Sequence, residues 1–395
     1  MQERSKSKTI IFYVITIGLS IVFSLAILEF GLAKFYAEIE ESGPDMSFDP
    51  TLGWRPVPGV RWTKPAHTLS AHTVSINQIG LRNREITREI QPELRRVILL
   101  GDSFTFAKAV RSEDIFPSLL ESQLNQIGRF EVINAGVPGY GTAQELLLMQ
   151  DLSKKQVVGD VYVLMFFLND ILDNLRLDYS NLEETPARPG FAILKDGELT
   201  QVAIPRKAYS ESLVPAPTGP PHFVTVEVVK RQVASFVQSR PWLADLITKV
   251  GFEQKVPRMP GVVNGWYRQD VLKAGIPLTR ALIRAIQVEA RKKGANLLVS
   301  IIPSPFEVYP ETYHPILKNT FPDNKYIEDY LSDQTRPQRI LGDICQELQI
   351  PFLDLLPILL SSNSKELYIP LEGHLTAEGH AVVARQLAEF IEKHL

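Results

Sequence analysis

Apolar runs of strand length alternate with amphipathic stretches through most of the chain after residue 95. The apolar runs cover residues 97–100, 130–134, 161–167, 295–302 and 350–353. Apolar residues at helical spacing lie between them, over residues 115–127, 142–155, 278–293 and 336–348, and again from Thr376 onward. Strands that alternate with helices are connected by right-handed crossovers, so the pattern predicts an α/β domain with a parallel sheet over residues 95–395.

Two segments interrupt this alternation. Residues 35–94 are rich in proline, glycine and tryptophan, which predicts a strand-and-loop lead-in packed beside the main domain. Between about 176 and 275, a hairpin signal around Lys195-Asp196-Gly197 is followed by a proline-rich stretch, which predicts an insertion. Long excursions of this kind are usually functional, so the insertion could shape a substrate cleft.

Residues 9–28 form an uncharged apolar run, and about 20 apolar residues span a bilayer as a helix. The first eight residues hold three basic side chains against one acidic one, which predicts a cytoplasmic N-terminal tail. We therefore expect a single-pass membrane protein whose remaining chain is extracytoplasmic, in a periplasm or at the cell surface. A cleaved signal peptide is the alternative, but its apolar run would be shorter, and only Gly31-x-Ala33 resembles a cleavage site.

Composition excludes some classes of partner. The chain has 395 residues, a net charge of -3 and no clustered basic face, so we expect no nucleic-acid partner. The single Cys345 lies in the predicted helix 336–348 and is expected to be buried. No pair of histidines has the spacing of metal ligands, so we expect no metal and no other cofactor. The sequence does not indicate an oligomeric state.

The first candidate for chemistry is Ser103. The apolar run 97–100 leads directly into Gly101-Asp102-Ser103, so this serine is expected at the carboxyl end of a strand where a helix begins. Open α/β sheets place their sites at that edge. An ordinary turn is the alternative interpretation of Gly-Asp-Ser.

Three further clusters follow predicted strands or precede a helix. Gly136 lies in a glycine-rich loop, where a backbone N–H can approach a ligand closely, and Asn169 could donate its side-chain amide to an oxyanion. His374 lies just before the last helix and could act as a base, with Glu372 two residues upstream to orient it. A turn glycine, a cap asparagine and a packing histidine are the alternatives, and His380, on the helix itself, is expected to pack or cap.

The four clusters together resemble the SGNH, or GDSL-like, hydrolase family. The matching segments are GDSFT with Ser103, NAGVPGYG with Gly136, FLND with Asn169 and EGHLTAEGH with His374. The resemblance implies a three-layer, flavodoxin-like α/β/α domain that performs ester hydrolysis or acyl transfer. It also implies an oxyanion hole made by the backbone N–H groups of Ser103 and Gly136 and the side chain of Asn169.

The chain departs from the family pattern at two positions. Phe167 replaces the glycine of the usual G-x-N-D segment, which would narrow the cleft. The usual aspartate before the last histidine is absent, and Glu372 is the nearest carboxylate upstream. We assign the acid role to Glu372, with a Ser-His dyad as the alternative and Asp354 as a less favoured substitute.

The lead-in carries a second, looser resemblance. Its segments LGWRPVPG and SINQIGLRNRE resemble the part that precedes the catalytic domain in membrane-anchored bacterial members linked to surface polysaccharides. Trp54, Asn77 and Arg82 would either contact a substrate or form a structural extension.

These observations predict a membrane-anchored serine esterase. Ser103 Oγ would attack an ester carbonyl, His374 would take its proton, and Glu372 would steady the imidazolium. The expected substrate is an acyl ester, with an acetyl group on a carbohydrate such as an O-acetylated glycan favoured. The alternatives are an O-acyltransferase of surface polysaccharide modification and a catalytically silent accessory protein of polysaccharide assembly.

Overall fold

The structure is a computed structural model of the whole chain. It describes residues 46–64, 72–86, 92–175, 188–193, 198–202 and 261–362, most of residues 364–395, and six residues between 13 and 27. The predicted basic tail 1–8 and most of the predicted span 9–28 lie outside the described residues. Within the described part, no helix combines the length and the apolar character needed to cross a membrane.

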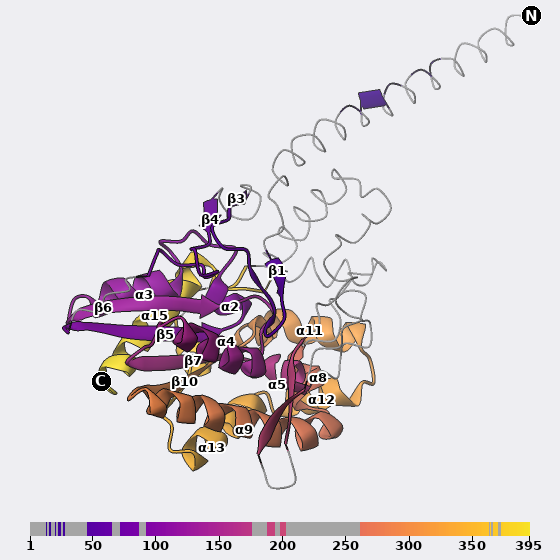
Figure 1. Cartoon of the computed structure of the whole chain (residues 1–395). Helices are drawn as coiled ribbons and strands as arrows, with labels where there is room; N and C mark the ends of the chain where they lie inside the picture. Colours follow the sequence, from indigo (N-terminus) through magenta and orange to yellow (C-terminus); the bar gives the residue numbers. More distant parts are fainter. Residues whose placement is uncertain are drawn as a thin grey trace, which may run out of the picture.

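A five-stranded parallel sheet forms the centre of the domain (Figure 1). Its strands are β5 (Leu94–Gly101), β6 (Arg129–Gly136), β7 (Val161–Phe167), β10 (Asn296–Ile302) and β11 (Phe352–Asp354). Their spatial order is β11-β10-β7-β5-β6, and every neighbouring pair is parallel. The predicted α/β domain with a parallel sheet is confirmed. The direction of winding reverses between β5 and β7, which is where flavodoxin-like sheets bind their ligands.

Helices cover both faces of this sheet. One face is packed by α3 (Phe116–Leu124) and α15 (Ala377–Glu392), and the other by α4 (Thr142–Lys154), α9 (Gln269–Lys292) and α13 (Arg336–Glu347). Strand β5 shows why the apolar run is continuous, because Val97 and Leu99 enter one core while Ile98 and Leu100 enter the other. Cys345, on α13, is buried as expected.

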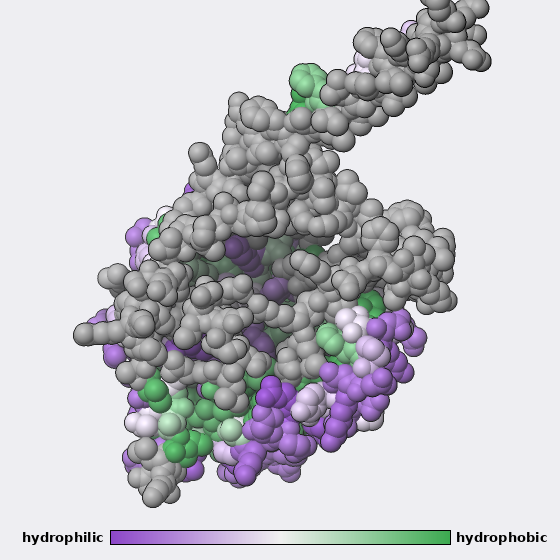
Figure 2. Space-filling model, turned by 90° about the vertical axis from the view of Figure 1, so that its right-hand side faces the viewer, coloured by the Kyte–Doolittle hydropathy of each residue, from purple (hydrophilic) through white to green (hydrophobic). Residues whose placement is uncertain are grey.

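Several short helices connect these elements. Helix α2 (Ser103–Phe106) begins at Ser103, as predicted, whereas six others were not predicted from the sequence: α5 (Asp170–Leu175), α8 (Gly261–Trp266), α10 (Pro305–Val308), α11 (Pro310–Thr320), α12 (Lys325–Ser332) and α14 (Leu356–Ser361). Helix α12 is amphipathic, since it buries Ile327 and Tyr330 and exposes Lys325 and Glu328. Hydrophilic residues also cover much of the coloured lower part of the face in Figure 2. Helices α10 and α11 each begin with a proline, a residue that more often marks a turn or loop in a sequence, so the pattern did not predict them.

The predicted insertion is described only in part. Strands β8 (Gly190–Ile193) and β9 (Leu199–Val202) form an antiparallel hairpin, as the signal around Lys195-Asp196-Gly197 indicates. Strand β8 contacts α4, α5 and α9, so this hairpin is docked on the domain. Residues 203–260 lie outside the described part of the chain.

The lead-in forms two antiparallel hairpins, and its Arg82 side chain binds backbone carbonyls of the α/β domain, a set of bonds that we call the Arg82 clamp. The hairpins are β1 (Met46–Asp49) with β2 (Gly53–Pro56), and β3 (Arg61–Lys64) with β4 (His72–Ser75). The Arg82 side chain, 2% exposed, donates to the carbonyls of Phe106 and Ala107 and, at 2.6 Å, to that of Val110. Burial lowers the pKa of Arg82 to about 10.

The other two lead-in residues that were candidates for contacting a substrate, Asn77 and Trp54, also form hydrogen bonds within the protein. Asn77, 3% exposed, accepts the N–H groups of Ile79 and Leu81 and donates to the Arg84 carbonyl. The Trp54 indole donates to the Pro138 carbonyl at 2.9 Å. These bonds support the structural interpretation of the lead-in rather than a substrate contact.

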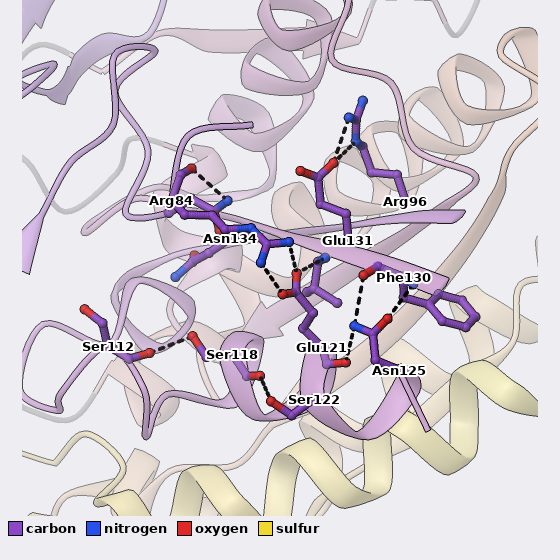
Figure 3. Close-up of polar contacts among 12 residues, drawn as sticks. Arg84, Arg96, Ser112, Ser118, Glu121, Ser122, Asn125, Phe130, Glu131 and Asn134 are labelled. Atoms are coloured by element: carbon purple, nitrogen blue, oxygen red, sulfur yellow. Dashed lines mark hydrogen bonds and ion pairs between the residues drawn. The ribbon is translucent and has the colours of Figure 1, made fainter. Parts of the chain in front are cut away.

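Figure 3 shows two ion pairs, one between the lead-in and helix α3 and one between strands β5 and β6 of the sheet. Arg84 contacts Glu121 of α3 at 2.9 Å, and the same carboxylate accepts the Val132 N–H of β6 at 2.8 Å. Arg96 and Glu131 face each other across β5 and β6 at 2.7 Å, and each side chain is 1% exposed. Because Arg96 and Glu131 are paired, neither charge is buried without a partner, which would be strongly destabilising.

The Arg82 clamp leads to a prediction about stability. Replacing Arg82→Met leaves three buried carbonyls without their donor, so we expect the free energy of unfolding to fall by about 3 kcal/mol. The matched control is Arg84→Met, whose side chain is 60% exposed and whose ion pair is worth about 1 kcal/mol or less. Chemical denaturation of the purified full-length variants measures both. Equal losses in the two variants would contradict the clamp.

Candidate active site

Ser103 lies at the turn that joins β5 to α2, as predicted. It is the first residue of α2 and is half-buried. The Asp102 carboxylate accepts the Phe104 N–H at 2.9 Å and so caps this short helix. The helix ends at Ala107, whose left-handed backbone (φ 57°) directs its N–H to the Ser103 carbonyl. The Asp102 cap fixes the start of α2 and Arg82 binds carbonyls at its end, so the short helix that begins at Ser103 is held at both ends.

The structure brings His374 to Ser103. The His374 Nε2 lies 2.7 Å from Ser103 Oγ, although 271 residues separate them in the chain. Thr376 caps α15 by accepting the Gly379 N–H, which places the last helix start where the sequence predicted it. An imidazole in hydrogen-bond contact with a serine hydroxyl can take its proton, so the pair has the geometry of a nucleophile and its base.

Glu372, the predicted acid partner of His374, lies outside the described residues. Asp354 accepts the Leu356 N–H at 2.9 Å at the start of α14, and burial raises the pKa of this carboxyl. Its observed role is to hold the turn that leads into α14.

His380 packs and caps, as expected. It is 1% exposed, its Nδ1 accepts the Phe116 N–H at 3.2 Å, and its ring stacks on that of Phe116. Burial lowers the pKa of His380 to about 3, with smaller contributions from the charges of Arg82 and His374. The ring is therefore neutral at ordinary pH.

Gly136 has a clear packing role beside the serine turn. It pairs with Gly101 across β6 and β5, and a Cβ on Gly136 would lie 2.4 Å from the Phe106 nitrogen. Only glycine allows α2 to approach β6 this closely. The Gly136 N–H donates to Asn134 Oδ1 at 3.0 Å, so this predicted oxyanion donor is engaged within the protein.

The loop after β6 presents another N–H, at Gly139. The Tyr140 backbone N–H donates to the Val137 carbonyl at 3.1 Å across a turn in which Gly139 has φ 77°. Proline followed by a glycine of positive φ is typical of a type II turn, so Pro138-Gly139 was the sequence signal for it. The Val137 N–H donates to the Gly101 carbonyl at 3.0 Å, which keeps the loop beside the serine turn. Among the described residues, neither the Gly139 nor the Ser103 N–H has a hydrogen-bond acceptor.

Asn169 lies between β7 and α5 and is half-buried. Its Nδ2 donates to Asp173 Oδ2 at 2.7 Å, which uses one of the two amide hydrogens. The Asn169 Oδ1 is buried and accepts no hydrogen bond from the described residues. The amide is thus held by one bond and retains one N–H for a ligand.

Buried carboxyl groups surround this part of the site. Burial raises the pKa of Asp102 to about 7 and raises those of Glu145 and Asp170 well above their usual range. The charge of Asp102 contributes to both of the latter shifts, and the charge of Glu145 also raises the pKa of Asp170. These groups favour their neutral forms. In the described part of the chain, no three His, Cys, Asp or Glu side chains are arranged to hold a metal ion.

Phe167 supports the imidazole through a second ring. Its centroid lies 4.1 Å from that of Phe104, and the Phe104 ring lies 4.7 Å from that of His374. The phenylalanine that replaces the family glycine therefore fills space behind the Ser103–His374 pair.

Comparison with known proteins places this geometry in a family. The sequence model of the GDSL-like Lipase/Acylhydrolase family matches residues 99–382, a range that includes Ser103, Gly136, Asn169 and His374. The chain belongs to this family. The resemblance inferred from its motifs is confirmed, and the protein is an ester-hydrolysing enzyme.

Solved structures give weaker matches to this GDSL-like chain. A lipase/acylhydrolase from Enterococcus faecalis is 12% identical, with a TM-score of 0.36 over 76% of this chain and 97% of that one. The esterase EstA from Pseudoalteromonas sp. is 11% identical, with a TM-score of 0.35 over 76% and 97%. An acetylxylan esterase from Geobacillus stearothermophilus is 11% identical, with a TM-score of 0.37 over 77% and 96%. No curated protein matches the chain.

The buried His380 leads to a prediction about pH. The native ring stays neutral down to a pKa of about 3, whereas the unfolded ring binds a proton near pH 6.5. Between these values unfolding takes up a proton, so stability falls as pH falls, by up to about 1.4 kcal/mol per pH unit. We expect His380→Gln to lose less stability than the wild type between pH 6.5 and 4. Chemical denaturation at several pH values measures this difference.

The control for that measurement is His394→Gln, near the end of the chain, which should leave the wild-type pH dependence unchanged. If His380→Gln also leaves it unchanged, His380 does not supply the acid-sensitive step.

Proposed function

We propose that this enzyme is a membrane-anchored serine esterase that removes short acyl groups, chiefly acetyl, from carbohydrate esters outside the cytoplasm. The observation that carries the proposal is the 2.7 Å contact between Ser103 Oγ and His374 Nε2. It lies where the parallel sheet reverses its direction of winding, between the carboxyl ends of β5 and β7.

The proposed reaction follows from these two side chains. Ser103 Oγ attacks the ester carbonyl while His374 takes the hydroxyl proton, and the same imidazole then protonates the leaving alcohol. Water hydrolyses the acyl-enzyme in the reverse sequence. Glu372 steadies the imidazolium, and a Ser-His dyad is the alternative if it does not.

Three N–H groups would stabilise the tetrahedral oxyanion. Two of them are the backbone N–H of Ser103 and the amide hydrogen of Asn169 that Asp173 does not use. Gly136 was the expected third donor, but its N–H would first have to leave Asn134. The Gly139 N–H has no acceptor among the described residues, so we place the third donor there. Each such donor is typically worth about a hundredfold to a thousandfold in rate.

Two features support the substrate class. The Phe167 ring, packed on Phe104, occupies space that glycine leaves open in the family pattern, and this favours a small acyl group. The lead-in resembles that of anchored relatives linked to surface polysaccharides, which favours a glycan as the alcohol part of the ester.

The proposed anchor is the apolar run 9–28. Three of its described side chains are large and apolar and lie mostly exposed, Tyr13 by 59%, Phe23 by 67% and Ile27 by 59%. Exposed apolar surface of this kind is unfavourable in water, and lipid would cover it. The basic residues before the run would keep the N-terminus in the cytoplasm and the esterase on the other side.

The anchor predicts where the protein is found. We expect the full-length chain to sediment with membranes and to stay there after an alkaline carbonate wash, because a spanning helix is not held by charge. A chain released by the wash, or found with the first residues removed, would contradict the anchor and favour the signal peptide.

The proposed chemistry is tested with nitrophenyl acetate and a fluorophosphonate probe. We expect wild-type enzyme to turn over the ester and to be labelled, and Ser103→Ala and His374→Ala to lose both activities. Asn169→Ala should lower kcat about a hundredfold to a thousandfold. Ser122→Ala, on the outer surface of α3, is the matched serine control. Absence of wild-type labelling would favour the silent accessory protein.

Two further measurements refine this result. We expect Glu372→Ala to lower kcat by about a hundredfold or more if Glu372 orients the imidazole, whereas near-normal rates would establish the dyad. Adding an oligosaccharide should leave free acetate as the main product. Transfer of acetyl to the sugar would instead make the enzyme an O-acyltransferase.

A further inference from the structure

A chain of three buried polar side chains runs from the proposed oxyanion hole into the insertion. Asn169 Nδ2 donates to Asp173 Oδ2 at 2.7 Å, and Asp173 Oδ1 lies 3.3 Å from Arg188 Nη2. Asp173 is on α5, whereas Arg188 lies just before β8 in the inserted segment. The Asp173 side chain is 5% exposed and that of Arg188 7%, so water screens neither charge well.

The contact with Asp173 decides how the Asn169 amide is oriented. An amide has two donor hydrogens, and a bond from one of them to a carboxylate is short and strong. The Asn169 Oδ1 has no partner among the described residues, so that oxygen does not help to hold the group. With one hydrogen on Asp173, the amide plane is set and the second hydrogen has a defined direction.

Asp173 in turn needs a cation. Its charge acts on the buried carboxyls of Asp102, Glu145 and Asp170, and it raises the pKa of each. A carboxylate in such surroundings is costly unless an opposite charge is paired with it. Arg188 supplies that charge.

Arg188 is itself held by two other parts of the molecule. Its Nη1 donates to Gln144 Oε1 of α4 at 3.0 Å, and its guanidinium lies 5.2 Å from the ring centroid of Trp54 in the lead-in. A planar guanidinium that satisfies a carboxylate, an amide and a ring face at once has little freedom to move. Its position is therefore defined by the docked lead-in and insertion together.

From this geometry we infer that Arg188 is a positioning residue of the esterase, which acts through Asp173 to hold the Asn169 amide ready for the oxyanion. The inference rests on the proposed role of Asn169 as an oxyanion donor. It gives the insertion a catalytic purpose, since its docking completes the site. An interaction of this kind is used in the transition state, so its loss lowers kcat more than it changes KM.

The test uses full-length enzyme and nitrophenyl acetate. We expect Arg188→Met to lower kcat about tenfold to a hundredfold, with KM changed by about twofold or less. Arg188→Lys keeps the charge without the fork and should recover part of the rate. In an Asn169→Ala background, Arg188→Met should cost about twofold or less, because the group it positions is gone.

The control is Arg55→Met, which removes half-buried ion pairs of a lead-in arginine with Asp49 of the lead-in and Asp151 of α4. It should keep the wild-type kcat. If Arg188→Met does not fold, the double variant Arg188→Met/Asp173→Asn removes both charges of this ion pair and should fold with the same loss of kcat.

The outcomes separate the two ideas. An Asn169→Ala enzyme with wild-type kcat would refute the oxyanion role itself, and the positioning role with it. If Asn169→Ala is impaired but Arg188→Met keeps the wild-type kcat, only the positioning role is overturned. It is also overturned if Arg188→Met lowers kcat by the same factor with and without Asn169, because Arg188 would then act elsewhere.

Discussion

The parallel pairing of β5 with both β6 and β7 is the constraint on which the site depends. Because the three strands run in one direction, the chain leaves each of them at the same edge of the sheet. Ser103, the loop after Gly136 and Asn169 follow these three ends. His374, just before the start of α15, lies at the same edge, so residues far apart in the chain meet there.

This edge of the sheet is unfavourable for stability, because it contains several buried polar groups. Asp102, Glu145 and Asp170 all lie in the interior, where burial raises their pKa values and favours the neutral forms. Asp173 lies close to these groups and is paired with the Arg188 guanidinium at 3.3 Å. Proteins commonly accept such local cost at functional sites and offset it by packing elsewhere. Here the two large cores on either side of the sheet provide that packing.

The lead-in and the insertion are part of the same construction. Arg82 closes the backbone behind the serine helix, Trp54 holds the loop at Pro138, and Arg188 reaches Asp173. Each contributes donors to buried acceptors that the α/β domain leaves open. Removing either segment would therefore expose or orphan polar groups close to the catalytic pair, which explains why both are docked so tightly where the structure describes them.

Local patterns determined the strands, the serine turn and the cap at Thr376, since these depend on neighbouring residues alone; β7 occupies residues 161–167, as its apolar run predicted. These patterns missed helical residues next to prolines. Pro277 lies inside α9, and prolines begin α10 and α11. Tertiary structure alone decided the 2.7 Å contact of His374 with Ser103, the engagement of the Gly136 N–H by Asn134, and the link from Asn169 to Arg188. The reason is physical: orientation and burial at a site come from segments that pack together in space, and no spacing along the chain records them.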